Sequence, residues 1–124
     1  MSHLKDSVID HVYVKSVKKS IVPKIIIADL EGSNLKISMD IHQEVFNVKE
    51  GEKLEFVLSH SLPDYKEGED FCARGVVVGF KEDERGFRAI VSLYGFLVVI
   101  YPRDREILKD YKPTDEIYLC LKKF

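Results

Sequence analysis

Residues 35–42 alternate without interruption between apolar and polar side chains, and this pattern limits the folds open to the chain. The odd positions are apolar and the even positions are polar, in the order Leu35, Lys36, Ile37, Ser38, Met39, Asp40, Ile41 and His42. Successive side chains of a β-strand point to opposite faces, so the segment is predicted to be a strand with one buried and one solvated face.

Seven further apolar segments are also predicted to be strands. They lie at residues 8–17, 24–30, 53–59, 71–80, 87–94, 96–101 and 116–121, and residues 102–110 are predicted to form a short helical turn. About eight short strands without a long amphipathic helix are typical of a small β-sandwich or β-barrel. Gly75 and Gly79 fall inside one predicted strand, where glycine often marks a bulge or a close approach of two backbones. These glycines favour a closed and strongly curved barrel.

The predicted fold is therefore all-β, a single antiparallel barrel of the oligonucleotide-binding (OB) type that spans residues 1–124. The length suits one domain and is sufficient for a hydrophobic core that stabilises the fold without disulfides or metals. For residues 1–24 the sequence leaves two alternatives open. They form an N-terminal strand at the edge of the barrel, or they contact a neighbouring chain.

Composition indicates a folded soluble protein with no strong overall attraction to polyanions. The chain is 45% apolar and 32% charged, its net charge is −2, and its pI is near 6.1. Neither nucleic acid nor an anionic membrane is expected to attract such a chain as a whole. The longest apolar run, residues 95–101, is far short of the roughly 20 residues of a membrane-spanning helix. With no signal peptide visible, we expect a cytoplasmic protein without membrane contact.

The two cysteines, Cys72 and Cys120, lie in predicted strands and lack the C-x-x-C spacing of many metal and redox sites. The first interpretation is a pair of buried thiols in an intracellular protein. A disulfide between neighbouring strands remains an open alternative.

Catalytic motifs are not found in the sequence, which contains no nucleophile elbow, P-loop or dinucleotide-binding pattern. Asp40 and His42 share one face of a strand and are the strongest metal-like pair, but the sequence offers them no third ligand. We therefore predict no catalytic residue, metal or cofactor in this chain, and activity of the chain alone is not expected.

Four lysines fall in a segment without acidic residues between Asp10 and Asp29. They are Lys15, Lys18, Lys19 and Lys24. The simpler interpretation is a solvated surface, and the alternative is a basic patch that faces RNA, DNA or an acidic partner.

Apolar side chains are unusually dense around Gly95. Tyr94 precedes this glycine, and Phe96 and Leu97 begin the apolar run that follows it. This density exceeds what one wall of a small barrel needs, so these side chains either cover the core or dock on a partner.

Three blocks of the sequence resemble the eighth common subunit of archaeal and eukaryotic RNA polymerases, called the G subunit in archaea. The blocks are residues 36–41 with Glu44, Phe46 and Val48, then Arg74 and Gly75 with residues 80–82, then Ser92, Gly95, Leu97 and Ile100 with residues 117–119. Together they cover most of the chain from residue 34 onward, whereas residues before 25 match weakly. The short loop 63–70 suits an archaeal member, because the eukaryotic members carry a longer insertion there. Tyr94 is a second departure from the eukaryotic members, which have the second glycine of the serine–glycine block at this position.

The resemblance implies an eight-stranded OB-like barrel at the periphery of a DNA-directed RNA polymerase, a nucleotidyltransferase whose catalytic magnesium belongs to another chain. It implies a non-catalytic subunit that stabilises the assembly by docking on the largest subunit, with at most weak or indirect contact to nucleic acid. The side chains expected to anchor this contact are Phe46, Tyr94, Phe96 and Leu97. The four lysines, Lys15, Lys18, Lys19 and Lys24, are a secondary contact candidate.

Two other functions stay open. A free-standing OB-type module that binds single-stranded nucleic acid would use Lys18 and Lys19 and would bind in a salt-dependent way. A barrel that holds a small ligand or performs catalysis would need convergent polar groups, which the sequence does not indicate.

Overall fold

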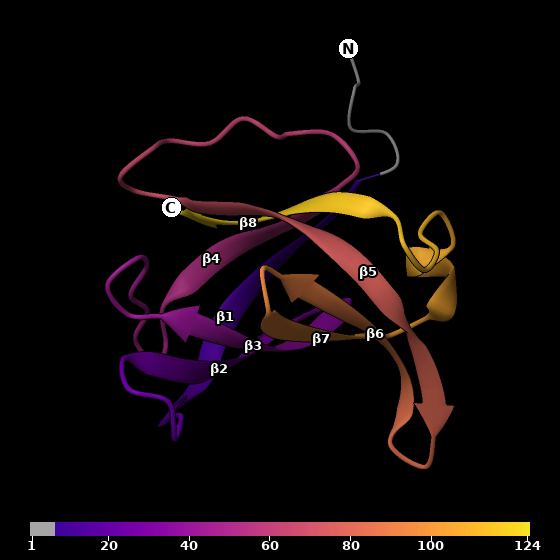
Figure 1. The fold of residues 1–124 in the computed structure, drawn as a ribbon, viewed down its shortest axis with the longest axis horizontal. Helices are drawn as coiled ribbons and strands as arrows, with labels where there is room; N and C mark the ends of the chain where they lie inside the picture. Colours follow the sequence, from indigo (N-terminus) through magenta and orange to yellow (C-terminus); the bar gives the residue numbers. More distant parts are fainter. Residues whose placement is uncertain (1–6) are drawn as a thin grey trace.

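The computed structural model describes residues 7–124 and confirms the predicted all-β barrel of eight strands (Figure 1). A single 3-10 turn, η1, precedes the last strand. The elements are β1 (Val8–Lys19), β2 (Ile25–Gly32), β3 (Leu35–His42), β4 (Lys53–Ser59), β5 (Phe71–Asp83), β6 (Gly86–Leu93), β7 (Phe96–Pro102), η1 (Arg105–Leu108) and β8 (Glu116–Lys123).

The strands close on themselves in the order β1-β2-β3-β7-β6-β5-β8-β4, and every neighbouring pair is antiparallel. The chain forms two sequential meanders, β1-β2-β3 and β5-β6-β7, which β3 and β7 join. Pairing of β4 with both β8 and β1 closes the barrel. β1 is therefore hydrogen-bonded on both sides, to β2 and to β4, so residues 8–19 form a strand within the closed barrel. Residues 1–6 of the predicted N-terminal segment lie outside the described residues.

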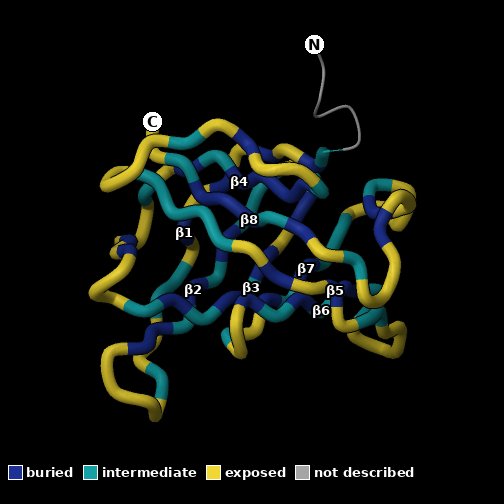
Figure 2. Tube along the Cα trace, turned by 45° about the horizontal axis from the view of Figure 1, so that its top comes forward, coloured by how far each residue is buried: buried dark blue, intermediate teal, exposed yellow. Residues whose placement is uncertain are grey.

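The core contains side chains from all eight strands, and buried residues, dark blue in Figure 2, recur along the strands. The four apolar positions of the alternating segment 35–42 are 1–3% exposed, which confirms the predicted buried face. Phe56 of β4 is fully buried and is the largest of these side chains. Burial of a large apolar side chain contributes about 1.5–3 kcal/mol, so this continuous core is the main stabilising feature of the fold.

Gly75 lies where two strands approach each other too closely for a side chain. A Cβ atom at this position would lie 2.4 Å from the carbonyl oxygen of Ser92 and 2.6 Å from Cδ2 of Leu93. The register of β5 against β6 also shifts between Val77 and Gly79. These features match the prediction of a close approach and a bulge at the two strand glycines.

The structure differs from the sequence prediction at the β5–β6 hairpin and at the two cysteines. β5 and β6 extend to a short turn at residues 84–85, because pairing continues through charged residues as far as Asp83 with Gly86. Cys72 and Cys120 are register partners on β5 and β8 and form a disulfide, so the first interpretation as free thiols is wrong.

Candidate docking surface

The outer side of β5 and β7, together with the turn between β6 and β7, carries several exposed apolar side chains, which we call the apolar face. Its exposed members are Val76, Val78, Tyr94 and Leu97. Across the sheet, Val76 pairs with Ser92 and Ser92 pairs with Leu97, so the three strands contribute neighbouring positions. Ile90 and Val99, partners on β6 and β7, are half-buried and continue the face. Exposed apolar surface of this kind is typical of a protein–protein contact.

The turn between β6 and β7 presents Tyr94 to solvent. Tyr94 and Gly95 both have positive φ, at 56° and 92°, as in the tight two-residue turns that match the twist of paired strands. The backbone N–H of Gly95 donates to Oγ of Ser92 at 3.0 Å, which fixes the turn. Tyr94 is 83% exposed, and its positive φ is uncommon for a residue other than glycine.

Polar groups border the apolar face. Arg74 and Glu116 form an ion pair at 2.6 Å and, together with Val76 and Tyr94, line a shallow hollow of about 330 Å³. On the other border, the backbone N–H of Leu97 donates to Oδ2 of Asp40 at 3.3 Å. An apolar centre with a polar rim is the usual composition of a protein interface.

The structure brings together only part of the predicted anchor set. Tyr94 and Leu97 lie on the apolar face, whereas Phe96 is half-buried and packs against the core. Phe46 is 6% exposed and its ring lies 5.7 Å from that of Phe71, because the irregular segment after β3 folds back against the barrel. Phe46 is therefore a core residue of this chain and is not available at the surface.

Val76 and Val78 are members of the face that the sequence did not identify. They lie in the apolar run of residues 75–80, where flanking glycines and Val77 hide the alternation. Only the register of β5 against β6 separates the outward valines from the buried Val77, which is 1% exposed.

The four predicted basic contacts do not form one free cluster. Lys15 pairs with Glu31 at 3.5 Å, and Lys24 pairs with Glu44 at 2.7 Å. Lys18 and Lys19 are exposed at the end of β1 and form no ion pair within residues 7–124. Two of the four charges are therefore compensated within the chain.

A second, smaller set of exposed apolar side chains lies on β1 and at the C-terminus. Ile9 and Tyr13 are 47% and 43% exposed, and Phe124, which contacts the His11 ring edge-on, is 76% exposed. In the strand order β1 is four steps from β6 in either direction, so this set lies on the opposite wall of the barrel from the apolar face.

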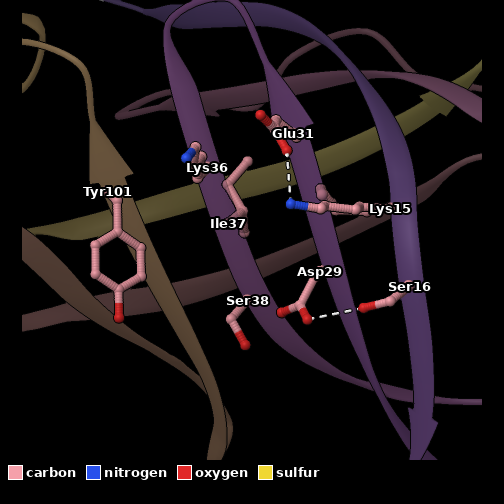
Figure 3. A pocket seen from close by; sticks show the side chains of 9 residues that line it. Lys15, Ser16, Asp29, Glu31, Lys36, Ile37, Ser38 and Tyr101 are labelled. Atoms are coloured by element: carbon pink, nitrogen blue, oxygen red, sulfur yellow. Dashed lines mark hydrogen bonds and ion pairs between the residues drawn. The ribbon is translucent and has the colours of Figure 1, made fainter. Parts of the chain in front are cut away.

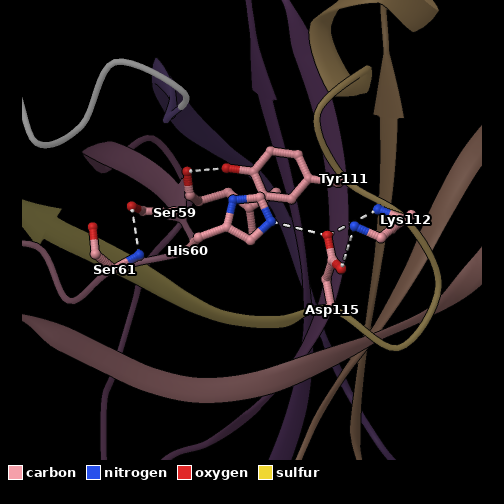
Figure 4. Close-up of polar contacts among 7 residues, drawn as sticks. Ser59, His60, Ser61, Tyr111, Lys112 and Asp115 are labelled. Carbon is pink, nitrogen blue, oxygen red and sulfur yellow. Dashed lines mark hydrogen bonds and ion pairs between the residues drawn. The ribbon is translucent and has the colours of Figure 1, made fainter.

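His60 and Asp115 form a polar link between the segment after β4 and the segment before β8 (Figure 4). Nε2 of His60 lies 2.9 Å from Oδ2 of Asp115, and the imidazole stacks on the Tyr111 ring at 4.4 Å. The Tyr111 hydroxyl donates to the carbonyl of Leu58 at 3.0 Å. The hydrogen bond from His60, followed by one from the backbone of Lys112, lowers the pKa of Asp115. These contacts tie two loops to the barrel.

Metal-binding clusters of three or more His, Cys, Asp or Glu side chains are not found in the described part of the chain. Asp40 and His42 each accept a backbone hydrogen bond, from Leu97 and from Glu44. Among residues 7–124 there is also no helix with the length and hydropathy needed to cross a membrane.

The closed barrel and its apolar face define a small β-barrel module. Comparison with known proteins then identifies the family. A family model for the G subunit of DNA-directed RNA polymerase matches residues 7–124, and the chain belongs to this family. The predicted resemblance is thereby confirmed.

Two relatives support this assignment. DNA-directed RNA polymerase subunit Rpo8 of Sulfolobus acidocaldarius is 33% identical over 113 residues, which cover 89% of this chain and 93% of the relative. The subunit Rpo8 of Saccharolobus solfataricus is 25% identical over 117 residues, covering 89% of this chain and 88% of the relative. Among solved structures, the cytoplasmic molybdate-binding protein ModG aligns over 92% of this chain and 89% of its own. Its TM-score of 0.37 and identity of 12% are too low to support any inference.

Proposed function

We propose that this chain, a non-catalytic subunit of DNA-directed RNA polymerase, docks on the largest subunit through the apolar face. The single observation that carries the docking site is the group of exposed apolar side chains on β5, β7 and the turn between β6 and β7. Family membership and the Rpo8 relatives support the polymerase as the assembly. In this role the chain works in the cytoplasm with the enzyme, and its partners supply the catalytic chemistry.

The physical basis of the proposal is a rigid surface with an aromatic anchor. Tyr94 is the most exposed member of the face, and tyrosine is enriched among the residues that dominate binding energy at interfaces. The flanking strands are hydrogen-bonded on both sides, so the face loses little conformational freedom on binding. The barrel would thereby stabilise the region of the largest subunit that it covers.

Charge substitutions on the two opposite walls test this proposal. Leu97→Asp places a carboxylate on the apolar face, whereas Ile9→Asp introduces the same change at a similarly exposed strand position on β1 (50% and 47% exposed). Each tagged variant is expressed in cells that contain the polymerase, and the complex is purified with a high-salt wash. We expect Leu97→Asp to reduce recovery of the largest subunit at least tenfold and Ile9→Asp to leave it unchanged.

The thermal midpoint of each free variant is the control for folding, and both should lie within a few degrees of the original protein. Equal recovery of the largest subunit with both variants would contradict the assignment of the apolar face. If Ile9→Asp alone reduced recovery of the largest subunit, the docking site would be assigned to the wall formed by β1.

A further inference from the structure

A groove lies on the outer side of the barrel around Tyr101 near the end of β7, and Figure 3 shows the side chains that line part of it. It consists of two adjoining hollows of about 420 and 500 Å³, which share Glu31, Lys36 and Tyr101 in their walls. Leu97 and Tyr101 are four residues apart on β7, a separation of about 13 Å along an extended strand. A ligand in the groove and a protein on the apolar face therefore occupy different ends of the same strand.

Three cations from three separate segments line the second hollow. Lys36 is the second residue of β3, Arg85 lies at the turn between β5 and β6, and Arg103 follows β7. None of the three forms an ion pair within the described residues. The neighbouring carboxylate Asp83 is held by Arg88 through contacts of 2.9 and 3.1 Å, and Glu31 is paired with Lys15.

This hollow is positive although the chain as a whole is negative. Its walls contain three cations and one carboxylate, a net charge of +2, whereas the net charge of the protein is −2. An excess of positive charge in a concave surface attracts polyanions locally, and it does so without making the whole molecule basic.

An aromatic ring stands beside these cations. Tyr101 is half-buried and is the register partner of Lys36, so the two side chains project from neighbouring strands into the same groove. Ser33 and Asn34, at the turn between β2 and β3, add polar groups to the wall. A positive groove with an aromatic platform is the combination that binds single-stranded nucleic acid, because phosphates contact the cations and a base stacks on the ring.

We propose that this groove binds a short segment of single-stranded nucleic acid. Lys36, Arg85 and Arg103 contact the phosphates, and Tyr101 stacks on a base. From the sequence alone such binding is expected at Lys18 and Lys19, which lie at the opposite end of the β1–β2 hairpin from the turn at Gly32. The groove is assembled by tertiary structure from cations in three distant segments, which is the reason the sequence does not reveal it.

Fluorescence anisotropy of the full chain with labelled 12-mers of oligouridylate and oligodeoxythymidylate tests the proposal. We expect a dissociation constant of about 10–100 μM at low ionic strength, in the range of non-specific binding. With three phosphate contacts, the logarithm of affinity should fall against the logarithm of salt with a slope of about −2. Preference between the two oligomers reports whether RNA or DNA is the better ligand.

Two double charge-reversal variants, which change the net charge equally, distinguish binding in the groove from a general electrostatic effect. Arg85→Glu with Arg103→Glu should weaken binding at least tenfold and flatten the salt dependence. The matched control, Lys18→Glu with Lys19→Glu, should change affinity less than threefold. Tyr101→Ala should weaken binding about tenfold without changing the salt slope, because stacking is not an ionic contact. The side chains of Arg85 and Arg103 form no hydrogen bond within residues 7–124, so the fold should persist, as thermal midpoints would verify.

Absence of oligonucleotide binding at low salt would overturn the proposal. An equal loss of affinity in the two double variants would also overturn it. A labelled oligoglutamate that binds as tightly as the oligonucleotides, with no effect of Tyr101→Ala, would assign the groove to an acidic peptide and would also overturn it. Leu97→Asp should leave oligonucleotide affinity unchanged, so this test is independent of the docking proposal.

Discussion

Asp10 holds the turn between β2 and β3 from the neighbouring strand, and its removal should destabilise the barrel strongly. Its Oδ2 atom accepts the backbone N–H groups of Asn34 and Leu35, each at 3.0 Å, and Asp10 itself is 7% exposed. Gly32 lies so close that a Cβ atom there would be 2.3 Å from the same oxygen. Asp10→Ala therefore leaves two donors without their acceptor beside a tightly packed turn.

The expected loss of stability in Asp10→Ala follows from the burial of the two donors. Leu35 is 1% exposed, so its N–H loses a charge-assisted hydrogen bond and gains no water, which costs about 1.5–3 kcal/mol. The N–H of Asn34 is only part-buried and can regain water, which limits its cost to about 0.5–1 kcal/mol. The sum is about 2–4 kcal/mol, which for a chain of this length corresponds to a decrease in melting temperature of about 8–15 °C.

Calorimetry and urea unfolding measure this change directly. Asp64→Ala, at an exposed loop position, is the matched control and should shift the melting temperature by less than about 2 °C, as is usual for surface substitutions. Asp10→Asn keeps an acceptor but removes the charge, so its stability should lie between those of the original protein and Asp10→Ala. A loss below about 0.5 kcal/mol in Asp10→Ala, within the range of ordinary surface substitutions, would refute the reasoning.

Two further predictions concern packing and acid stability. Gly75→Ala forces a Cβ atom against the backbone of Ser92 and should cost about 1–3 kcal/mol in urea unfolding, whereas Gly68→Ala has open space but a positive φ and should cost less. The lowered pKa of Asp115 means that the unfolded chain binds a proton more readily than the folded chain, so this contribution is complete above the unfolded value of about 3.9 and is lost as pH falls further. Melting temperature measured from pH 6 to pH 2 should fall less steeply in Asp115→Asn than in the original protein, and identical slopes would contradict this assignment.

Strand positions could be predicted from the sequence because burial imposes the alternation locally. The segment 35–42 is the clearest case, since the polarity of each side chain indicates the face of the strand on which it lies. The extension of β5 to Asp83 was missed because its last residues are charged, and pairing there depends on the partner strand rather than on burial. Closure of the barrel through β1 and β4 depends on contacts between distant segments, which alternation does not encode.

The candidate surfaces were predicted less completely for the same physical reason. Tyr94 could be identified because it lies beside a glycine turn, but Phe46 and Leu97 are both apolar residues near strand ends, and only tertiary packing separates the buried one from the exposed one. The groove at Tyr101 depends on three distant cations and has no local signature. Sequence patterns thus report the fold through local periodicity, whereas the surfaces are set by long-range register.

Site-specific crosslinking in the assembled polymerase tests the docking site most directly. A photoreactive phenylalanine analogue replaces either Tyr94 on the apolar face or Tyr13 on the opposite wall, and crosslinked chains are identified by mass spectrometry. We expect the Tyr94 position to crosslink to the largest polymerase subunit and the Tyr13 position not to do so. Crosslinks to that subunit from the Tyr13 position alone would contradict docking through the apolar face.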